Sequence, residues 1–122
     1  MSASDYAENE IADWLGGNGA TPAMANVYAK LHIGDPGEAG TANAAAETDR
    51  VEVTFDASSG GVVALAATAT WTAVSTTETY SHVSLWDAAT AGNCIGSGAM
   101  TTPVDVVAGN DFDLTALTIT VT

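Results

Sequence analysis

The sequence predicts a mainly β protein: a single antiparallel β-sandwich or open barrel with one short N-terminal α-helix, in one domain spanning residues 1–122. From about residue 26 onward, apolar and polar residues alternate with a period of two, as in half-buried strands. Turn-forming residues separate these alternating segments at short intervals. No helical period recurs after residue 16, which argues against a parallel α/β sheet.

Residues 3–15 have the spacing of a short amphipathic helix. Its apolar face consists of residues that recur at intervals of three and four: Ala3, Ala7, Ile11, Trp14 and Leu15. We expect Ser2 to cap the helix start and the glycine pair Gly16-Gly17 to end it. A helix this short needs contacts with the rest of the protein for stability, so we expect it to dock on the sheet.

Strands are expected from about residue 26 to residue 121. In the first, residues 27–33, the odd positions are apolar, and Lys30 and His32 point to the opposite face. Residues 34–49 are small and acidic and indicate an exposed loop. The same alternation predicts the later strands, at about residues 51–55, 63–71, 80–87, 93–100, 104–107 and 111–121.

The charge balance excludes several classes of function. The chain has 2 Lys and Arg residues against 15 Asp and Glu residues, for a net charge of -13. Nucleic-acid binding and attachment to anionic lipid both need clustered basic residues, so we expect neither partner. The single cysteine, Cys94, rules out a disulfide within the chain. There is also no apolar run of about 18–20 residues that would span a membrane and no signal-peptide pattern at the N-terminus.

The residues that could carry chemistry do not form a recognisable constellation. His32 and His82 are expected at outward-facing positions on strands, and Cys94 is expected as a small buried hydrophobe. These three lack the local spacing of a metal site or a thiol catalyst. The carboxylates at 35–38 and 111–113 do not follow the pattern of a calcium loop. We therefore expect no catalytic residues, no cofactor and no metal.

The aromatic residues suggest where the core lies and which surfaces make contacts. Trp71 and Phe55 are expected in sheet interiors. Trp86 is either packed under the N-terminal helix, which we favour, or exposed as a platform for a sugar or a protein. The final strand has no flanking Lys or Pro, so it must be central, covered or paired with another chain. The candidate interface residues are Trp86, Tyr80, Asp35, Glu38, Leu117, Ile119 and Val121.

Taken in order, several segments along nearly the whole chain resemble a family of small tailed-phage virion proteins. The segments that carry this resemblance are 25–28, Leu31 with 35–40, 53–55, 70–71, 82–90, 97–103, 108–112 and 117–121. Members of that family are described as head decoration, minor tail or tail-fibre proteins. The resemblance implies a structural component of the virion without catalytic residues.

Electrostatics favours a place on the outside of the particle. Packaged DNA is a dense polyanion and would repel a subunit with a charge of -13. We therefore expect a capsid decoration protein that stabilises the shell from its outer face. Its partners would be the major capsid protein and copies of itself, as a small homo-oligomer such as a trimer. The alternatives are a tail-tip or tail-fibre subunit, and a carbohydrate-binding module that uses Trp86 or Tyr80.

Overall fold

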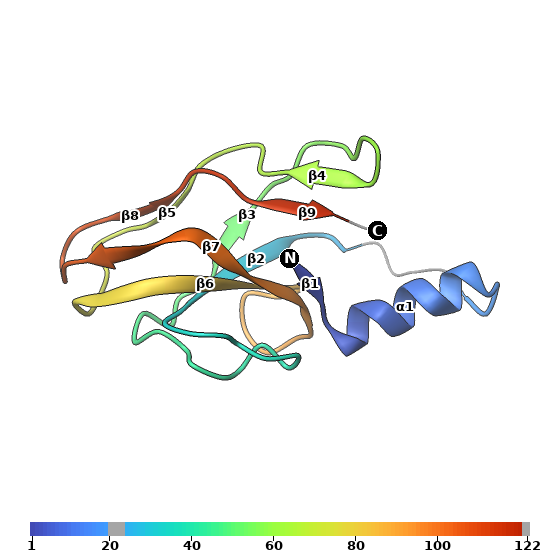
Figure 1. Ribbon diagram of the computed structural model, residues 1–122, viewed down its shortest axis with the longest axis horizontal. Helices are drawn as coiled ribbons and strands as arrows, with labels where there is room; N and C mark the ends of the chain where they lie inside the picture. The colour runs from blue at the N-terminus through green and yellow to red at the C-terminus, as the bar shows by residue number, and fades with distance from the viewer. Residues whose placement is uncertain (20–23, 121–122) are drawn as a thin grey trace.

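Two layers of antiparallel strands form the body of the protein, and one helix projects from its end (Figure 1). The structure, a computed structural model, describes residues 1–19 and 24–120. Its elements, in chain order, are β1 (Ser2–Ala3), α1 (Asp5–Leu15), β2 (Val27–His32), β3 (Val51–Val53), β4 (Val62–Ala64), β5 (Ala69–Trp71), β6 (Glu78–Trp86), β7 (Cys94–Val106), β8 (Phe112–Leu114) and β9 (Thr118–Thr120). The predicted mainly β, antiparallel fold is confirmed, and over the described residues it is an open sandwich instead of a barrel.

The larger layer is a five-stranded sheet in the order β1-β7-β6-β2-β3. In the pairing of β2 with β6, Leu31 lies opposite Val83 and Ala29 lies opposite Leu85. These four side chains are buried and belong to one cluster with Trp71 of β5. The core therefore lies between the large sheet and the two small sheets, β4–β9 and β5–β8.

The N-terminal helix forms, but it starts later than the sequence suggests. Ser4, and not Ser2, is the N-cap, and its side chain accepts a hydrogen bond from the amide of Ala7 at 3.2 Å. Ser2 and Ala3 are instead extended as β1, because their backbone pairs with Ser97 and Gly96 of β7. The helix ends at the glycine pair as predicted, with Gly17 in the left-handed region at φ +73°.

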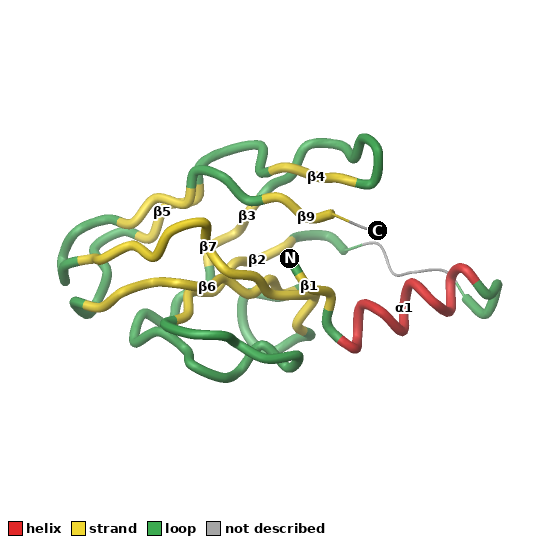
Figure 2. Tube along the Cα trace, viewed as in Figure 1, coloured by secondary structure: helices red, strands yellow, loops and turns green. Residues whose placement is uncertain are grey.

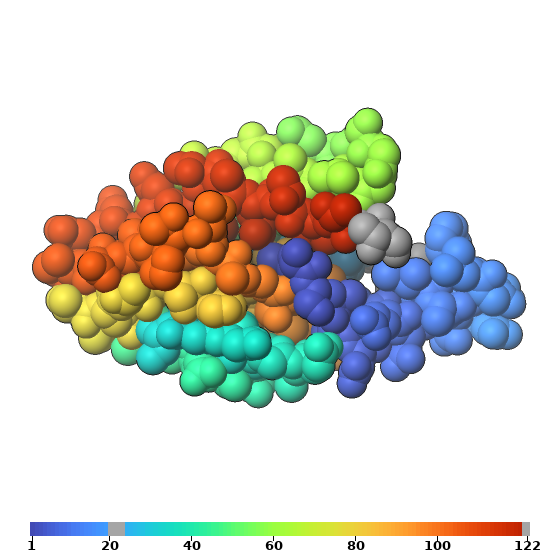
Figure 3. Space-filling model, viewed as in Figure 1, coloured from blue at the N-terminus to red at the C-terminus, as the bar shows by residue number. Residues whose placement is uncertain are grey.

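Helix α1 does not dock its apolar face on the sheet. It extends away from the body (Figures 2 and 3), and all of its residues are exposed or half-buried. Trp14 is 58% exposed and Leu15 is 73% exposed, so the expectation that this face packs on the sheet is wrong. Among the residues that the structure describes, no helix has the length and apolarity needed to cross a membrane.

β7 is one long strand where the sequence predicts two. The turn-like segment 101–103 does not break the strand but forms an irregularity within it. Tyr80 pairs with Val104 while His82 pairs with Ala99, so several residues of β7 lie opposite the single intervening residue of β6. Pro103, which has no backbone N–H to donate, is tolerated there because residues within a bulge do not pair with the neighbouring strand.

Two of the predicted strands are each divided into two short strands. Residues 63–71 contain the end of β4 and all of β5, and residues 111–121 contain β8 and β9. In each case the chain leaves one small sheet and enters the other, because β4 pairs with β9 and β5 pairs with β8. The final strand is thus paired within the chain, while the predicted interface residue Val121 lies outside the described residues.

The segment between β2 and β3, residues 33–50, covers the second face of the large sheet; we call it the cover loop (Figure 1). The sequence predicts an exposed loop over 34–49, but Pro36, Ala45 and Glu47 are buried. Two carboxylates hold the loop. Glu78 accepts hydrogen bonds from the amides of Ala46 and Glu47, and Glu47 accepts from the amides of Asp49 and Ser75. These two acidic side chains therefore hold the loop in place through hydrogen bonds instead of only pointing into solvent.

Trp71 and Trp14 provide a direct stability test of this fold. Trp71 is 2% exposed and its indole N–H donates to the carbonyl of Asp49 at 2.9 Å. Trp71→Ala should lower the free energy of unfolding by about 3–5 kcal/mol. Trp14→Ala should change it by less than about 0.5 kcal/mol, since that ring is largely in solvent. Urea unfolding followed by circular dichroism measures both values, and equal losses would contradict the exposed placement of α1.

Candidate functional site

A chain of buried hydrogen bonds connects the large sheet to the cover loop. The indole N–H of Trp86 donates to the hydroxyl of Ser84 at 2.8 Å. Nε2 of His32 lies 2.7 Å from the same hydroxyl oxygen, and Nδ1 lies 2.9 Å from the carbonyl oxygen of Ala42. A carbonyl only accepts, so Nδ1 carries the proton, and Nε2 accepts from the Ser84 hydroxyl. The two ring nitrogens of His32, the Ser84 hydroxyl and the Trp86 indole N–H are therefore all hydrogen-bonded when His32 is neutral.

His32 is completely buried, which corrects the prediction of a surface histidine. The strand period is right, since Leu31 enters the core and His32 points to the other face, but the cover loop encloses that face. Burial lowers the pKa of His32, and the hydrogen bond to Ala42 opposes this effect only in part. Protonation would turn Nε2 into a donor and leave the Ser84 hydroxyl proton without its acceptor, so the folded protein favours neutral His32.

Trp86 is buried by the loops of the same face and not by the N-terminal helix. The guanidinium of Arg50 lies 3.9 Å from its ring centroid. Arg50 also donates to the carbonyls of Ala88 and Ala91, at 2.8 and 2.7 Å. On the cover loop, a Cβ at Gly40 would lie 3.1 Å from Cζ2 of Trp86, which shows how closely this loop approaches the ring. The favoured interpretation, packing under α1, is therefore wrong, and Trp86 presents no open platform.

The two remaining candidates for metal or thiol chemistry lie apart in the structure. Cys94 is buried, as predicted, and burial raises the pKa of its thiol. His82 is half-buried and its Nδ1 lies 2.9 Å from the hydroxyl of Ser81. Within residues 1–19 and 24–120, no group of three His, Cys, Asp or Glu side chains is placed to hold a metal ion.

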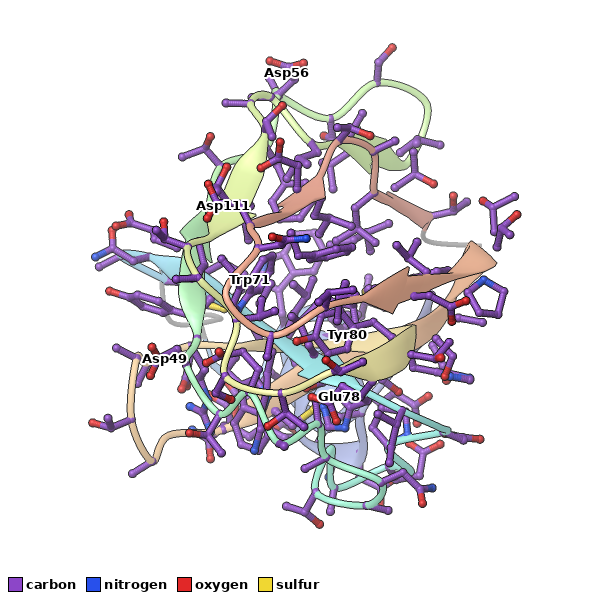
Figure 4. The ribbon with its side chains drawn as sticks, turned by 90° about the vertical axis from the view of Figure 1, so that its left-hand side faces the viewer. Asp49, Asp56, Trp71, Glu78, Tyr80 and Asp111 are labelled. Atoms are coloured by element: carbon purple, nitrogen blue, oxygen red, sulfur yellow. The ribbon has the colours of Figure 1, made fainter. Side chains whose placement is uncertain are left out.

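Tyr80 belongs to the core instead of an exposed surface. Its ring makes an edge contact with Phe112, with the ring centroids 5.2 Å apart. Burial, with smaller contributions from the charges of Glu78 and Glu47, raises the pKa of Tyr80 to about 12. Its hydroxyl has no hydrogen-bond partner in the described part of the chain. In Figure 4, Tyr80 and Trp71 lie toward the middle of the side chains, whereas Asp56 lies at the periphery.

The predicted acidic contact residues do lie at the surface. Asp35 and Glu38 are both exposed, and the carboxylate of Asp35 accepts the amide of Gly37 at 2.9 Å, which forms the predicted turn. Asp111 accepts the amide of Ala73 at 2.9 Å. Asp35 and Asp111 thus shape their turns, and a role of Asp35 and Glu38 in contacting a partner stays a prediction.

Two apolar grooves open at the surface of the sandwich. One, about 400 Å³ in volume, lies between α1 and the body and includes Ile11, Ile95 and Ile119. The other, about 560 Å³, runs between residues 98–104 of β7 and residues 112–118, which include β8 and the first residue of β9; we call it the seam. The predicted interface residues Leu117 and Ile119 are half-buried and line the seam and the α1 groove respectively. The sequence does not reveal the seam, because alternation assigns faces but not neighbouring strands.

The buried His32 predicts a pH-dependent stability. Its folded-state pKa is lowered, so the unfolded chain, with a histidine pKa of about 6.5, binds more protons in mildly acidic solution. The free energy of unfolding should therefore fall as the pH decreases from about 7 to 5. His32→Gln should flatten this slope, and the control His82→Gln should retain it. Urea unfolding at a series of pH values measures the slopes; identical slopes in wild type and His32→Gln would contradict the neutral, buried histidine.

The Tyr80 hydroxyl gives a second stability prediction. Because this buried hydroxyl lacks a partner, Tyr80→Phe should leave the free energy of unfolding unchanged or raise it by about 1 kcal/mol. Thermal unfolding of the two proteins measures the difference. A loss of more than about 1 kcal/mol would mean that the hydroxyl makes a stabilising hydrogen bond.

Two comparisons with known proteins bear on what this chain is. A search of curated proteins finds no match to the chain. A family model described as podophage GP4 fiber I protein gp80 matches residues 2–122, which is nearly the whole sequence. The predicted relation to tailed-phage virion proteins is confirmed by this match. The chain therefore belongs to the podophage GP4 fiber I protein gp80 family and is a phage structural protein.

Proposed function

We propose that this protein is a non-enzymatic subunit of a podophage tail fibre. The observation that carries the proposal is the match of residues 2–122 to a family described as a fibre protein. This description supports the tail-fibre alternative over capsid decoration, and the net charge, which argues only against a place beside the packaged DNA, is compatible with both. Binding to the major capsid protein is a prediction that nothing in the structure or the family match tests.

The use of the polar side chains supports a structural role. His32, Ser84 and Trp86 bond to one another and to the cover loop inside the fold. Trp86 and Tyr80, the residues on which a carbohydrate-binding module would depend, are buried. Neither ring is therefore available to stack on a sugar. We accordingly infer that the protein works by adhesion to its neighbours and holds no cofactor.

Helix α1 is the element that we expect to make a contact within the fibre. At this length a helix is marginal in water without tertiary contacts, yet its Trp14 and Leu15 side chains are mostly exposed. A neighbouring subunit that covers these two residues would supply the missing apolar burial. Copies of the same chain in a small homo-oligomer could serve as that neighbour.

Labelling of intact phage particles tests the location. Gold-conjugated antibody raised against the recombinant protein should bind at the tail of the virion in electron micrographs. The matched control is the same antibody pre-absorbed with the recombinant protein, which should label nothing. Labelling spread over the faces of the head would favour capsid decoration, and purified particles without label would contradict a role in the virion.

A further inference from the structure

The sandwich is open along one side, at the seam. β7 pairs with β6 on one edge, and on its other edge β1 pairs only as far as Ser97, with Met1 lying against Gly98. Across the groove, β8 pairs with β5 and β9 pairs with β4, each on one edge. In the part of the chain that the structure describes, the facing edges of β7, β8 and β9 thus have no strand between them.

The side to which the backbone N–H and C=O groups of β7 point can be followed past the end of β1. The carbonyl of Ile95 accepts the amide of Ser4, so residue 95 directs its backbone groups toward β1. Because these groups alternate along a strand, Ser97 and Ala99 direct theirs the same way. Ser97 still pairs with Ser2, but Ala99 lies beyond the end of β1. The amide and carbonyl of Ala99 therefore face the seam with no strand to bind among the described residues.

The floor of the seam is apolar. It includes side chains of the buried core and of its half-buried margin: Val83, Met100, Phe112, Leu114 and Leu117. Such a groove fits an extended peptide segment. The backbone of the segment would form hydrogen bonds with the free strand edge, and its alternate apolar side chains would pack on the apolar floor. Figure 3 shows the end of β7 beside the C-terminal strands on one face of the molecule.

One end of the seam is strongly acidic. A further hollow of about 370 Å³ shares Val104, Phe112 and Asp113 with the seam and adds Asp105 and Asp111. The carboxylate of Asp105 accepts a hydrogen bond from the hydroxyl of Thr79, and that of Asp113 accepts one from the hydroxyl of Thr70. Because the hydroxyls are neutral, these bonds do not compensate the negative charges of the two carboxylates. Of the two basic residues in the chain, Arg50 binds the carbonyls of Ala88 and Ala91, and Lys30 lies on β2 in the interior of the sheet.

We propose that the seam binds an extended segment of another protein, with alternating apolar residues and at least one Lys or Arg at the end beside Asp105 and Asp113. The segment would add a strand to the free edge of β7 and cover the exposed margin of the core. A second copy of this chain fits less well, because each copy carries a charge of -13. The inference rests on the proposed function only in expecting the partner to be another virion protein.

A synthetic peptide tests the seam with the purified protein. The probe is an acetylated and amidated heptapeptide, Lys-Val-Thr-Val-Thr-Val-Lys, and binding is followed by the ¹H–¹⁵N spectrum of the labelled protein. Shifts should concentrate at residues 98–104 and 112–118, and the amide of Ala99 should gain protection from hydrogen exchange. A peptide with Glu in place of both Lys should bind more weakly, and one with Pro at its centre should not bind.

Matched variants separate the charges of the seam from the charge of the whole protein. The double substitution Asp105→Asn with Asp113→Asn keeps an acceptor for each threonine hydroxyl but removes two charges. It should weaken binding of the Lys peptide by about 2- to 30-fold, as expected for two partly screened charge pairs. The control, Asp49→Asn with Asp56→Asn, makes the same change in net charge at exposed residues outside the seam and should not alter the affinity.

Three results would overturn the proposal. The first is no binding of the Lys peptide, and the second is shifts confined to α1. The third is tighter binding of a peptide copied from residues 116–122 than of the Lys peptide, which would identify a second copy of the chain as the occupant. None of these results bears on antibody labelling of the virion, so failure here leaves the proposed tail location to its own test.

Discussion

The fold depends on the neutral, buried His32, because this side chain joins the large sheet to the segment that covers it. One ring nitrogen binds the cover loop through Ala42, and the other accepts from Ser84 of β6, which also receives the Trp86 indole. A sheet whose second face is closed by a loop needs such bonds, since the loop brings backbone groups but few apolar side chains. With these bonds in place, Trp86 can be buried between Arg50 and Gly40.

The acidity of the chain also contributes to its fold. With two basic residues against 15 acidic ones, most carboxylates cannot form an ion pair within the chain, and several accept hydrogen bonds from backbone amides instead. Glu78 and Glu47 hold the cover loop, and Asp87 accepts both the amide and the side-chain nitrogen of Asn93. The bonds from Asn93 are the main reason that the pKa of Asp87 lies below its ordinary value. These bonds stabilise turns while the negative charge stays near the surface, available to attract basic partners.

The sequence predicts what depends on local pattern and misses what depends on contacts between distant segments. Alternation correctly places Leu31 and Trp71 in the core, and the family resemblance is confirmed. The same alternation cannot show that residues 33–50 fold back over the second face, so it predicts the wrong surroundings for His32 and Trp86. It also cannot show which strand edges remain free, and the seam is therefore a property of the structure alone.

The contrasting placement of the three tryptophans has an optical consequence. Trp71 is in the apolar core, Trp86 is under a guanidinium, and Trp14 stands on a projecting helix in water. The red edge of the protein's fluorescence emission should thus come from Trp14 alone. A blue shift of that component on assembly would report directly on burial of α1, without any added dye.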